Sequence, residues 1–97
     1  MNRRLLFIIN PNAGKGAIQT STLGRINTFV QSGFDVSVYT TQKAQDATSV
    51  ISRRAKDFDR IVCAGGDGTL NEVVTGLLQC GDNIPLGYIP AGTGNYF

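Results

Sequence analysis

The chain has 97 residues, of which 41% are hydrophobic and 16% are charged, and its formal net charge is +2. This length suits one small domain with its own core, and the composition excludes a disordered polymer. So small a net charge gives no argument for a nucleic-acid partner. Histidine is absent, which excludes histidine-based triads and histidine metal sites within these residues.

The sequence carries no signal for export or for membrane insertion. Its first apolar run covers only Leu5 to Ile9, whereas a secretory signal needs about 7–15 apolar residues and a membrane span about 20. Cys63 and Cys80 lack zinc-type spacing and are expected to be reduced structural thiols. We therefore expect a cytoplasmic protein with no transmembrane segment in this chain.

The first apolar run, residues 5–9, is typical of a central strand in a parallel sheet. It ends in a loop of turn-forming residues, 10–16. Lys15 lies between two glycines of this loop. It could reach a phosphate, or it could equally be a solvated surface lysine.

The middle of the chain predicts two helices separated by a strand. The first helix has an apolar stripe and is expected to end at a glycine; these residues are Leu23, Ile26, Phe29, Val30 and Gly33. Alternation over residues 36–40 predicts a second strand with one less-buried face. Asp46 precedes the inner stripe of a second helix, formed by Ala47, Val50, Ile51 and Ala55.

Residues 61–72 combine a strand, a glycine turn and a helix start. Residues 61–64 are expected to form a buried strand, and the glycines of Gly65-Gly66-Asp67-Gly68 allow the backbone to take positive φ and a ligand to approach closely. Thr69 and Glu72 are spaced as a capping box for the helix that follows. The predicted core-facing stripe of that helix is Leu70, Val73, Val74, Leu77 and Leu78.

A helix that begins on a glycine turn directs free N–H groups and its positive dipole end at one spot. Such a spot binds anions, most often phosphate. The alternative is a tight turn without a ligand, because short glycine motifs also match by chance. The run is neither a Walker loop nor a Gly-x-Gly-x-x-Gly fingerprint, since Asn71 stands where a third glycine would be.

A fourth strand is expected over residues 86–89, between two prolines, and a third glycine turn follows at 91–95. Alternating strands and helices predict a three-layer α/β/α domain with a parallel sheet of about four strands in the order 2-1-3-4. Loops 10–16, 65–69 and 91–95 all follow strand carboxyl ends, where such sheets bind ligands. We therefore expect a phosphate-bearing ligand at that edge.

Four motifs resemble the diacylglycerol kinase catalytic domain, the lipid-kinase branch of the superfamily that also holds the NAD kinases. In chain order they are a strand followed by Asn10-Pro11-Asn12-Ala13-Gly14, Thr41 five residues before Asp46-Ala47, the run from Gly65 to Glu72, and the run from Pro90 to Asn95. Together they span almost the whole chain. Asn71-Glu72 after the glycine turn favours the lipid branch over the NAD kinases.

The resemblance implies a kinase that transfers the γ-phosphoryl group of ATP, with Mg²⁺, to a lipid hydroxyl such as that of diacylglycerol. Residues 1–97 would be its N-terminal nucleotide-binding domain, inactive alone, because a C-terminal β-sandwich domain supplies the catalytic base and metal ligands. The nucleotide site implied by the motifs consists of Asn10, Thr41, Gly65, Gly66, Asp67, Gly68, Thr69, Leu70, Asn71, Glu72, Gly92 and Thr93.

Asp67 is the expected catalytic residue. A carboxylate is repelled by phosphate, so Asp67 should act through Mg²⁺ or on the acceptor hydroxyl. One departure from the family concerns Tyr96, which stands where an aspartate usually follows the third glycine turn. Tyr96 cannot act as an anion near neutral pH.

The expected partners are ATP and a lipid substrate at the membrane surface, which makes the enzyme peripheral to the membrane. A homo-oligomer is also expected, because an apolar edge strand at residues 86–89 tends to find another chain. Two other functions stay open: an NAD kinase-like enzyme and a nucleotide-binding module without catalysis. A dinucleotide acceptor would reveal the first.

Overall fold

The computed structural model describes residues 3–12 and 17–90, with side chains described from residue 22 onward in the first helix. Strands and helices alternate along the chain. The elements are β1 (Arg3–Ile9), α1 (Ala17–Gln31), β2 (Phe34–Thr40), α2 (Asp46–Arg54), a 3-10 helix η2 (Ala55–Asp57), β3 (Arg60–Gly65), α3 (Asp67–Cys80) and β4 (Leu86–Pro90).

The four strands form one parallel sheet in the order β2-β1-β3-β4, which confirms the predicted order. The inner strands β1 and β3 carry the continuous apolar runs, and residues 5–9 and 61–64 are buried. The outer strands β2 and β4 are mostly only partly buried. Burial on both faces explains why residues 5–9 and 61–64 are uniformly apolar, whereas β2 alternates.

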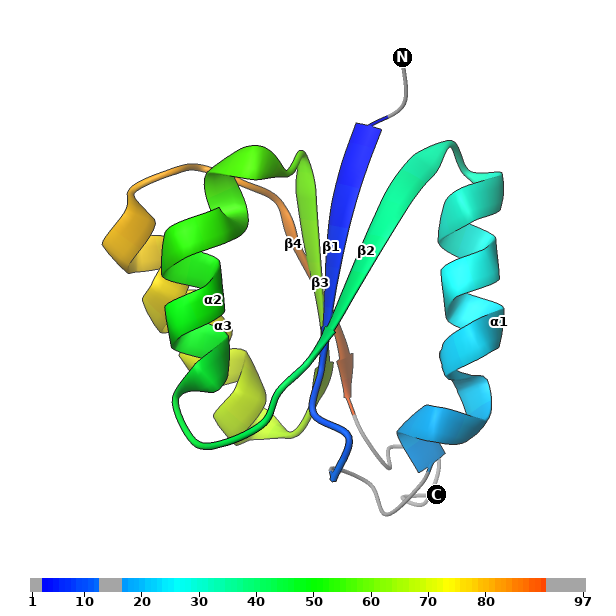
Figure 1. The fold of residues 1–97 in the computed structure, drawn as a ribbon, viewed down its shortest axis with the longest axis horizontal. Coiled ribbons are helices and arrows are strands. Elements are labelled where there is room, and N and C mark those ends of the chain that lie inside the picture. Colours follow the sequence, from blue (N-terminus) through cyan, green and yellow to red (C-terminus); the bar gives the residue numbers. More distant parts are fainter. Residues whose placement is uncertain (1–2, 13–16, 91–97) are drawn as a thin grey trace.

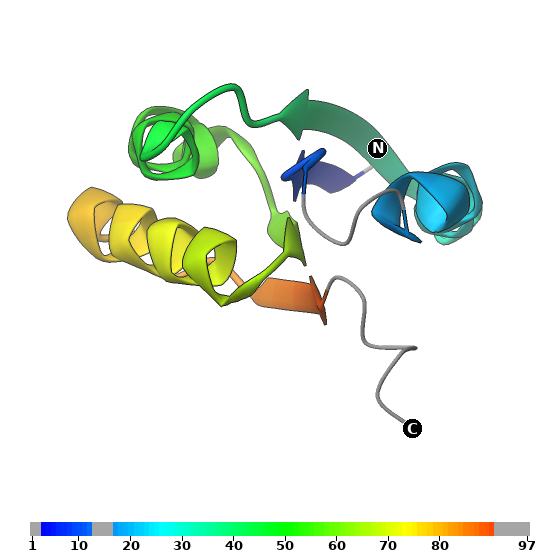
Figure 2. The ribbon, with the colours of Figure 1, turned by 90° about the horizontal axis from the view of Figure 1, so that it is seen from below.

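Helices cover both faces of the sheet. In Figure 1 the strands run between α2 and α3 on one side and α1 on the other. The view from below in Figure 2 shows α2 and α3 lying side by side on their common face. The domain is therefore the three-layer α/β/α sandwich that the sequence predicts. None of the helices in the described part of the chain is long and apolar enough to cross a membrane.

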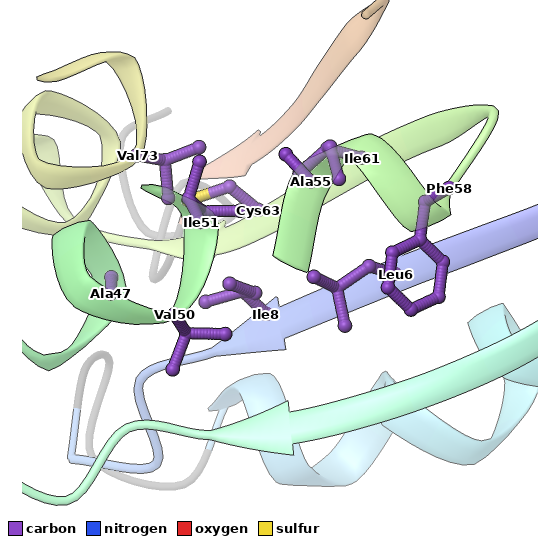
Figure 3. Close-up of a cluster of buried hydrophobic side chains, with 10 residues drawn as sticks. All are labelled: Leu6, Ile8, Ala47, Val50, Ile51, Ala55, Phe58, Ile61, Cys63 and Val73. Carbon is purple, nitrogen blue, oxygen red and sulfur yellow. The ribbon is translucent and has the colours of Figure 1, made fainter. Parts of the chain in front are cut away.

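The larger core lies between the sheet and the α2–α3 pair (Figure 3). The predicted inner stripe of α2 is buried as expected, with Ala47, Val50 and Ile51 each at most 2% exposed. Burying a side chain the size of Val or Ile stabilises the fold by about 1.5–3 kcal/mol. The buried members of this core are Leu6, Ile8, Ala47, Val50, Ile51, Ala55, Phe58, Ile61, Cys63 and Val73.

The smaller core lies under α1, and here the predicted helix stripe is only half right. Ile26 and Phe29 pack against the sheet, with the Phe29 ring edge-on to Phe7 at 5.4 Å between centroids. Leu23 and Val30 are 77% and 52% exposed. Because α1 is the one described helix on this face, residues at the flanks of its contact stripe have no neighbouring helix to cover them.

The predicted stripe of α3 is also narrower in the structure. Val73 is fully buried, whereas Val74 and Leu78 are 38% and 78% exposed. Helix α3 packs against α2 very closely at Gly76, where an added Cβ would lie 2.8 Å from the Ile51 Cβ. This contact turns one narrow face of α3 toward α2 and the sheet, so the Val74 and Leu78 side chains point outward.

Glycines end two of the helices as their positions in the sequence suggest. Gly33 follows α1 with φ +97°, which confirms the predicted stop, and Gly81 caps α3 with φ +75°. Only glycine adopts this left-handed backbone without strain. The chain is thereby turned back toward the sheet after each helix.

Candidate functional site

The carboxyl ends of the strands gather at one edge of the sheet, at the bottom of Figure 1, where α2 and α3 also begin. Backbone hydrogen bonds extend the sheet there: the Asn10 amide donates to the Ala64 carbonyl at 3.0 Å, and the Thr41 amide donates to the Ile9 carbonyl at 2.8 Å. Both predicted site residues therefore continue from strand ends, as the sequence indicates. Gly92 and Thr93, as well as Lys15 and Tyr96, lie outside the described residues.

Asn10 links the first loop directly to the glycine turn. Its side-chain Nδ2 donates to the Thr69 hydroxyl at 3.3 Å, and its side-chain Oδ1 accepts from the Asn12 backbone amide at 3.0 Å. Thr69 is 7% exposed, one of the few buried polar residues. These bonds hold the loop after β1 against the start of α3, so two of the predicted nucleotide-binding segments form one surface.

The glycine turn does not use the positive φ that its glycines allow. None of its glycines has positive φ, and Gly66, the N-cap of α3, has the extended values φ −88° and ψ −174°. Glycine is therefore useful here because it lacks a Cβ atom, and not because it can adopt a left-handed backbone. A Cβ on Gly65 would lie 2.8 Å from the Thr69 Oγ1, whereas a Cβ on Gly66 or Gly68 would meet nothing within 4 Å. Gly65 makes room for Thr69, and the other two leave room outside the fold.

Helix α3 begins with its amide groups turned to this open side. Its first intrahelical bond runs from the Leu70 amide to the Gly66 carbonyl at 3.1 Å. The amides of residues 67–69 therefore precede the helical ladder, and they lie at the positive end of the helix dipole. An anion placed here would meet several N–H donors and no Cβ atoms from Gly66 and Gly68.

The Asp67 side chain is exposed at the first turn of α3. Its Oδ1 lies 3.5 Å from the hydroxyl of Tyr88, which also donates to the Gly65 carbonyl at 3.2 Å. Asp67 lines a surface groove of about 510 Å³ with Gly68, Leu70, Asn71 and Val74. The predicted residues Leu70 and Asn71 thus border the groove, and Tyr88 is a neighbour of the site that the sequence did not single out.

The predicted capping box does not form. Thr69 lies within α3, which already begins at Asp67, so it cannot act as the N-cap. The Glu72 carboxylate instead accepts hydrogen bonds from the backbone amides of Gln45 at 3.1 Å and Ala47 at 3.2 Å. Glu72 therefore caps the neighbouring helix α2, because the close α2–α3 packing brings those amides within its reach.

A second carboxylate fixes the same loop from its own side. Asp46, which is 8% exposed, accepts from the Gln42 amide at 2.7 Å and from the Tyr39 hydroxyl at 2.8 Å. The bond from the Gln42 amide, more than any other influence, holds the pKa of Asp46 below its usual value. The hydrogen bond to Asp46 raises the pKa of Tyr39. The motif spacing singled out Asp46 in the sequence. Its hydrogen bond to Tyr39 depends on how β2 and α2 are placed in the fold and could not be predicted.

Both cysteines are free thiols, as expected. Cys63 lies fully buried in β3, and burial, with a smaller contribution from the negative charge of Glu72, raises the pKa of its thiol to about 12. A thiol with such a pKa stays protonated and is a poor nucleophile. Cys63 is therefore a core residue and takes no part in the site.

Within residues 3–12 and 17–90, no three metal-binding side chains of the His, Cys, Asp or Glu type come together. The carboxylate of Asp67 is nevertheless free of a backbone cap, unlike those of Asp46 and Glu72. A Mg²⁺ ion bound together with substrate phosphates needs only one or two protein carboxylates. The exposed Asp67, beside the amides of α3, fits that requirement.

This architecture defines a doubly wound α/β domain in which a helix without a side-chain N-cap begins at the carboxyl edge of the central strands, with glycine at positions 66 and 68. More specifically, the chain belongs to the diacylglycerol kinase catalytic domain family, whose model matches residues 4–97. The resemblance seen in the motifs is thereby confirmed.

Named relatives agree with this assignment. The chain is 41% identical over 99 aligned positions to a diacylglycerol kinase of Staphylococcus carnosus (strain TM300), covering 100% of this chain and 32% of that protein. It is 40% identical to a diacylglycerol kinase of Bacillus subtilis (strain 168), covering 98% and 32%. The chain therefore spans about a third of the length of these relatives.

A solved structure shares the fold. The crystal structure of a diacylglycerol kinase from Bacillus anthracis str. Sterne superposes with a TM-score of 0.79 and 35% sequence identity. The match covers 98% of this chain and 35% of that one. The three-layer arrangement is thus common to this chain and to part of a longer protein.

Proposed function

We propose that residues 1–97 are the N-terminal, nucleotide-binding domain of a lipid kinase that transfers the γ-phosphoryl group of ATP to a lipid hydroxyl such as that of diacylglycerol. The observation that carries the proposal is the start of α3, where the amides of residues 67–69 and the open space at Gly66 and Gly68 form an anion site. Membership of the diacylglycerol kinase catalytic domain family supports ATP and a lipid as the proposed ligands.

In this proposal the ATP phosphates lie on the amides at the start of α3. Asn10 and Thr41, which extend from the ends of β1 and β2, line the nucleotide pocket beside them. Leu70 and Asn71 border the groove on the outer side, and Gly92 and Thr93 complete the site as the motif resemblance implies. Phosphoryl transfer depends on positioning and charge neutralisation, which amide donors on a rigid turn supply.

Asp67 is the residue we assign to Mg²⁺ or to the acceptor hydroxyl. Its carboxylate is exposed on the groove and takes no part in capping a helix of the fold. Bound Mg²⁺ would neutralise charge on the transferring phosphoryl group. Asp67 would orient whichever of the two it binds, from a helix start whose position the Asn10–Thr69 bond helps to fix.

The acceptor, the catalytic base and further metal ligands belong to the longer parent protein of which we propose these residues to be part. The relatives are about three times as long as this chain, which leaves room for a second domain. A diacylglycerol acceptor resides in a membrane, so the parent would be a cytoplasmic enzyme that works peripherally at the membrane surface.

A phosphorylation assay on the purified parent tests this proposal. The parent is incubated with γ-labelled ATP, Mg²⁺ and a panel of acceptors in mixed micelles, including diacylglycerol, monoacylglycerol and ceramide, with NAD as a soluble acceptor. We expect label on a lipid hydroxyl. Label on NAD alone would make the parent an NAD kinase, and ATP binding without transfer would make it a non-catalytic nucleotide-binding protein.

A further inference from the structure

Helix α2 has no cap of its own at its N-terminus. Its N-cap residue is Gln45, whose side chain makes no capping hydrogen bond. The first helical amides must therefore find acceptors elsewhere. Glu72, on α3, supplies them: its Oε2 accepts from the Gln45 amide at 3.1 Å and its Oε1 from the Ala47 amide at 3.2 Å. One carboxylate thus uses both oxygens on the backbone of another element.

The backbone that Glu72 holds is strained. Gln45 has φ 67° and ψ 5°, and it is the one non-glycine residue with positive φ in the described part of the chain. A side chain makes this conformation unfavourable, and such strain persists only where surrounding bonds enforce it. Glu72 holds the Gln45 amide itself, and Asp46, the next residue, holds the Gln42 amide at 2.7 Å. The two carboxylates therefore keep a loop in a shape that it would not otherwise favour.

That loop is the one that carries Thr41. Its first residue is tied to β1 through the Thr41 amide, which donates to the Ile9 carbonyl at 2.8 Å. Its last residue, Gln45, is tied to Glu72 on α3. Because α3 begins at Asp67, Glu72 connects the Thr41 loop to the helix whose start forms the anion site.

Helices α2 and α3 are further joined so that this connection is rigid. The Thr48 hydroxyl donates to the backbone carbonyl of Glu72 at 2.8 Å. One turn further on, Gly76 packs so closely that an added Cβ would lie 2.8 Å from the Thr48 carbonyl. Because these contacts fix α2 and α3 to each other, we expect a substitution of Glu72 to change the position of the loop between Thr41 and Gln45.

We infer that Glu72 is a positioning residue, which sets the place of the Thr41 loop relative to the start of α3, and that it does not contact the nucleotide. Both carboxylate oxygens already accept backbone hydrogen bonds, unlike those of Asp67 on the groove. The inference rests on the proposed nucleotide site and replaces the expectation that Glu72 itself binds the ligand. Thr41 would make the contact, and Glu72 would hold it in place.

The test compares Glu72→Gln with Asp59→Asn in the parent protein. Glu72→Gln puts an NH₂ group opposite one of the two backbone donors, so one bond is lost while the shape is kept. Asp59→Asn removes the charge from the same kind of bond far from the site, where Asp59 accepts from the Arg4 amide at 2.8 Å. We expect Glu72→Gln to raise the Kd and KM for ATP by about tenfold with kcat within about twofold, and Asp59→Asn to change neither.

A second variant separates positioning from direct contact. Glycine takes the left-handed conformation without strain, so Gln45→Gly added to Glu72→Gln should let the loop keep its shape without the carboxylate. We expect the double variant to recover most of the lost ATP affinity. A kcat loss of several orders of magnitude that Gln45→Gly fails to restore would mark Glu72 as a ligand of the nucleotide or metal, and an unchanged Kd in Glu72→Gln would likewise overturn the inference.

Amide hydrogen exchange makes the outcome independent of the kinase proposal. In Glu72→Gln the amides of residues 41–47 should exchange faster than in the wild type, while Asp59→Asn leaves them unchanged. A wild-type parent that binds no ATP would contradict the proposed function alone, and exchange over residues 41–47 would still decide whether Glu72 positions the loop. Unchanged exchange in Glu72→Gln would contradict the inference.

Discussion

At the scale of single residues, Cys63 shows how a central strand changes the chemistry of a thiol. Burial between the sheet and the α2–α3 pair raises its pKa from near 9 to about 12. The folded chain therefore keeps the proton up to about pH 12, whereas the unfolded chain loses it from about pH 9. The stabilising effect of the protonated thiol is complete below pH 9 and declines as the pH rises toward 12.

We predict that the wild type loses about 1.4 kcal/mol more unfolding free energy than Cys63→Ala between pH 8 and pH 10. Urea denaturation at the two pH values measures the difference. Cys80→Ala serves as the control, because it removes the other free thiol of the chain. Equal pH dependence in the wild type and Cys63→Ala would contradict the assigned pKa.

Asp67 should separate activity from stability. Its carboxylate is exposed at the first turn of α3, so Asp67→Asn gives up only a favourable interaction with the helix dipole, about 0.3–1 kcal/mol. In the parent, the same change should lower kcat by orders of magnitude, since the charge for Mg²⁺ or for orienting the acceptor is gone.

Turnover and urea denaturation are measured on the same Asp67→Asn preparation. Asp82→Asn is the matched control, because Asp82 is an exposed carboxylate just after the other end of α3. It should leave turnover unchanged, and the loss of a negative charge at the helix C-terminus should not destabilise the fold. Retention of most of the activity in Asp67→Asn would place the catalytic carboxylate elsewhere.

At the scale of elements, two glycines in helices have opposite roles. Gly76 lies where α3 meets α2, and an added Cβ would come within 2.8 Å of the Ile51 Cβ and of the Thr48 carbonyl. Gly24 lies in α1, and a Cβ there would meet nothing within 4 Å. The same substitution therefore separates helix propensity from helix packing.

We predict that Gly76→Ala destabilises the fold by about 1–3 kcal/mol through overpacking, since the backbone carbonyl and the Cβ it meets cannot move aside locally. Gly24→Ala should instead stabilise by about 0.5–1 kcal/mol, because alanine is the better helix former. Denaturant unfolding of both variants measures the change in unfolding free energy, which should be a loss for Gly76→Ala and a gain for Gly24→Ala. An unchanged unfolding free energy in Gly76→Ala would show that α2 and α3 can move apart to admit the methyl group.

The type and order of the helices and strands can be predicted from local sequence patterns here. Which residues of each helix face the core cannot. The apolar run of β1 and the α2 stripe of Ala47, Val50 and Ile51 are both buried as predicted. Leu23 in α1 and Leu78 in α3 have the same spacing as core residues but are exposed. Whether a flank of a stripe is covered depends on which helix lies beside it, and periodicity carries no information on that.

The site shows the same division between local and tertiary information. Asn10, Thr41 and the glycine turn meet at one edge because parallel strands end together, which sequence order alone predicts. The role of Glu72 could not be predicted, because a carboxylate three residues after a threonine can reach either its own helix start or a neighbouring one. In the structure the Glu72 carboxylate lies within hydrogen-bond distance of the Gln45 and Ala47 amides, so it caps α2 and not its own helix.

At the scale of the whole molecule, the edge of the sheet at β4 is only partly buried. Strand β4 is an outer strand of the described sheet, and its residues 86–89 are only partly buried. Beside it, on the α1 face, lies an apolar groove of about 330 Å³ bordered by Phe29, Val62 and Ile89. Apolar edges and grooves of this kind favour contact with another chain.

We therefore predict that the isolated chain of residues 1–97 self-associates at tens of micromolar. Sedimentation velocity should give a weight-average mass above the 10.4 kDa of the monomer. Ile89→Lys, which places a charge at the groove, should shift the distribution toward the monomer. A clean monomer for the unsubstituted chain would contradict this prediction and the expectation of a homo-oligomer.

Gly68→Ala in the parent protein tests whether the start of α3 binds the phosphates of ATP. A Cβ at Gly68 meets no protein atom within 4 Å and alanine is the better helix former, so the fold should be at least as stable as before, while the new methyl group enters the space assigned to the phosphates. The measurement is the Kd for ATP, with Gly24→Ala as the control for a glycine substitution remote from the site. We expect the Kd to rise about tenfold or more in Gly68→Ala and to stay unchanged in Gly24→Ala. Equal ATP affinity in the wild type and a folded Gly68→Ala variant would show that the ATP phosphates do not bind at the start of α3.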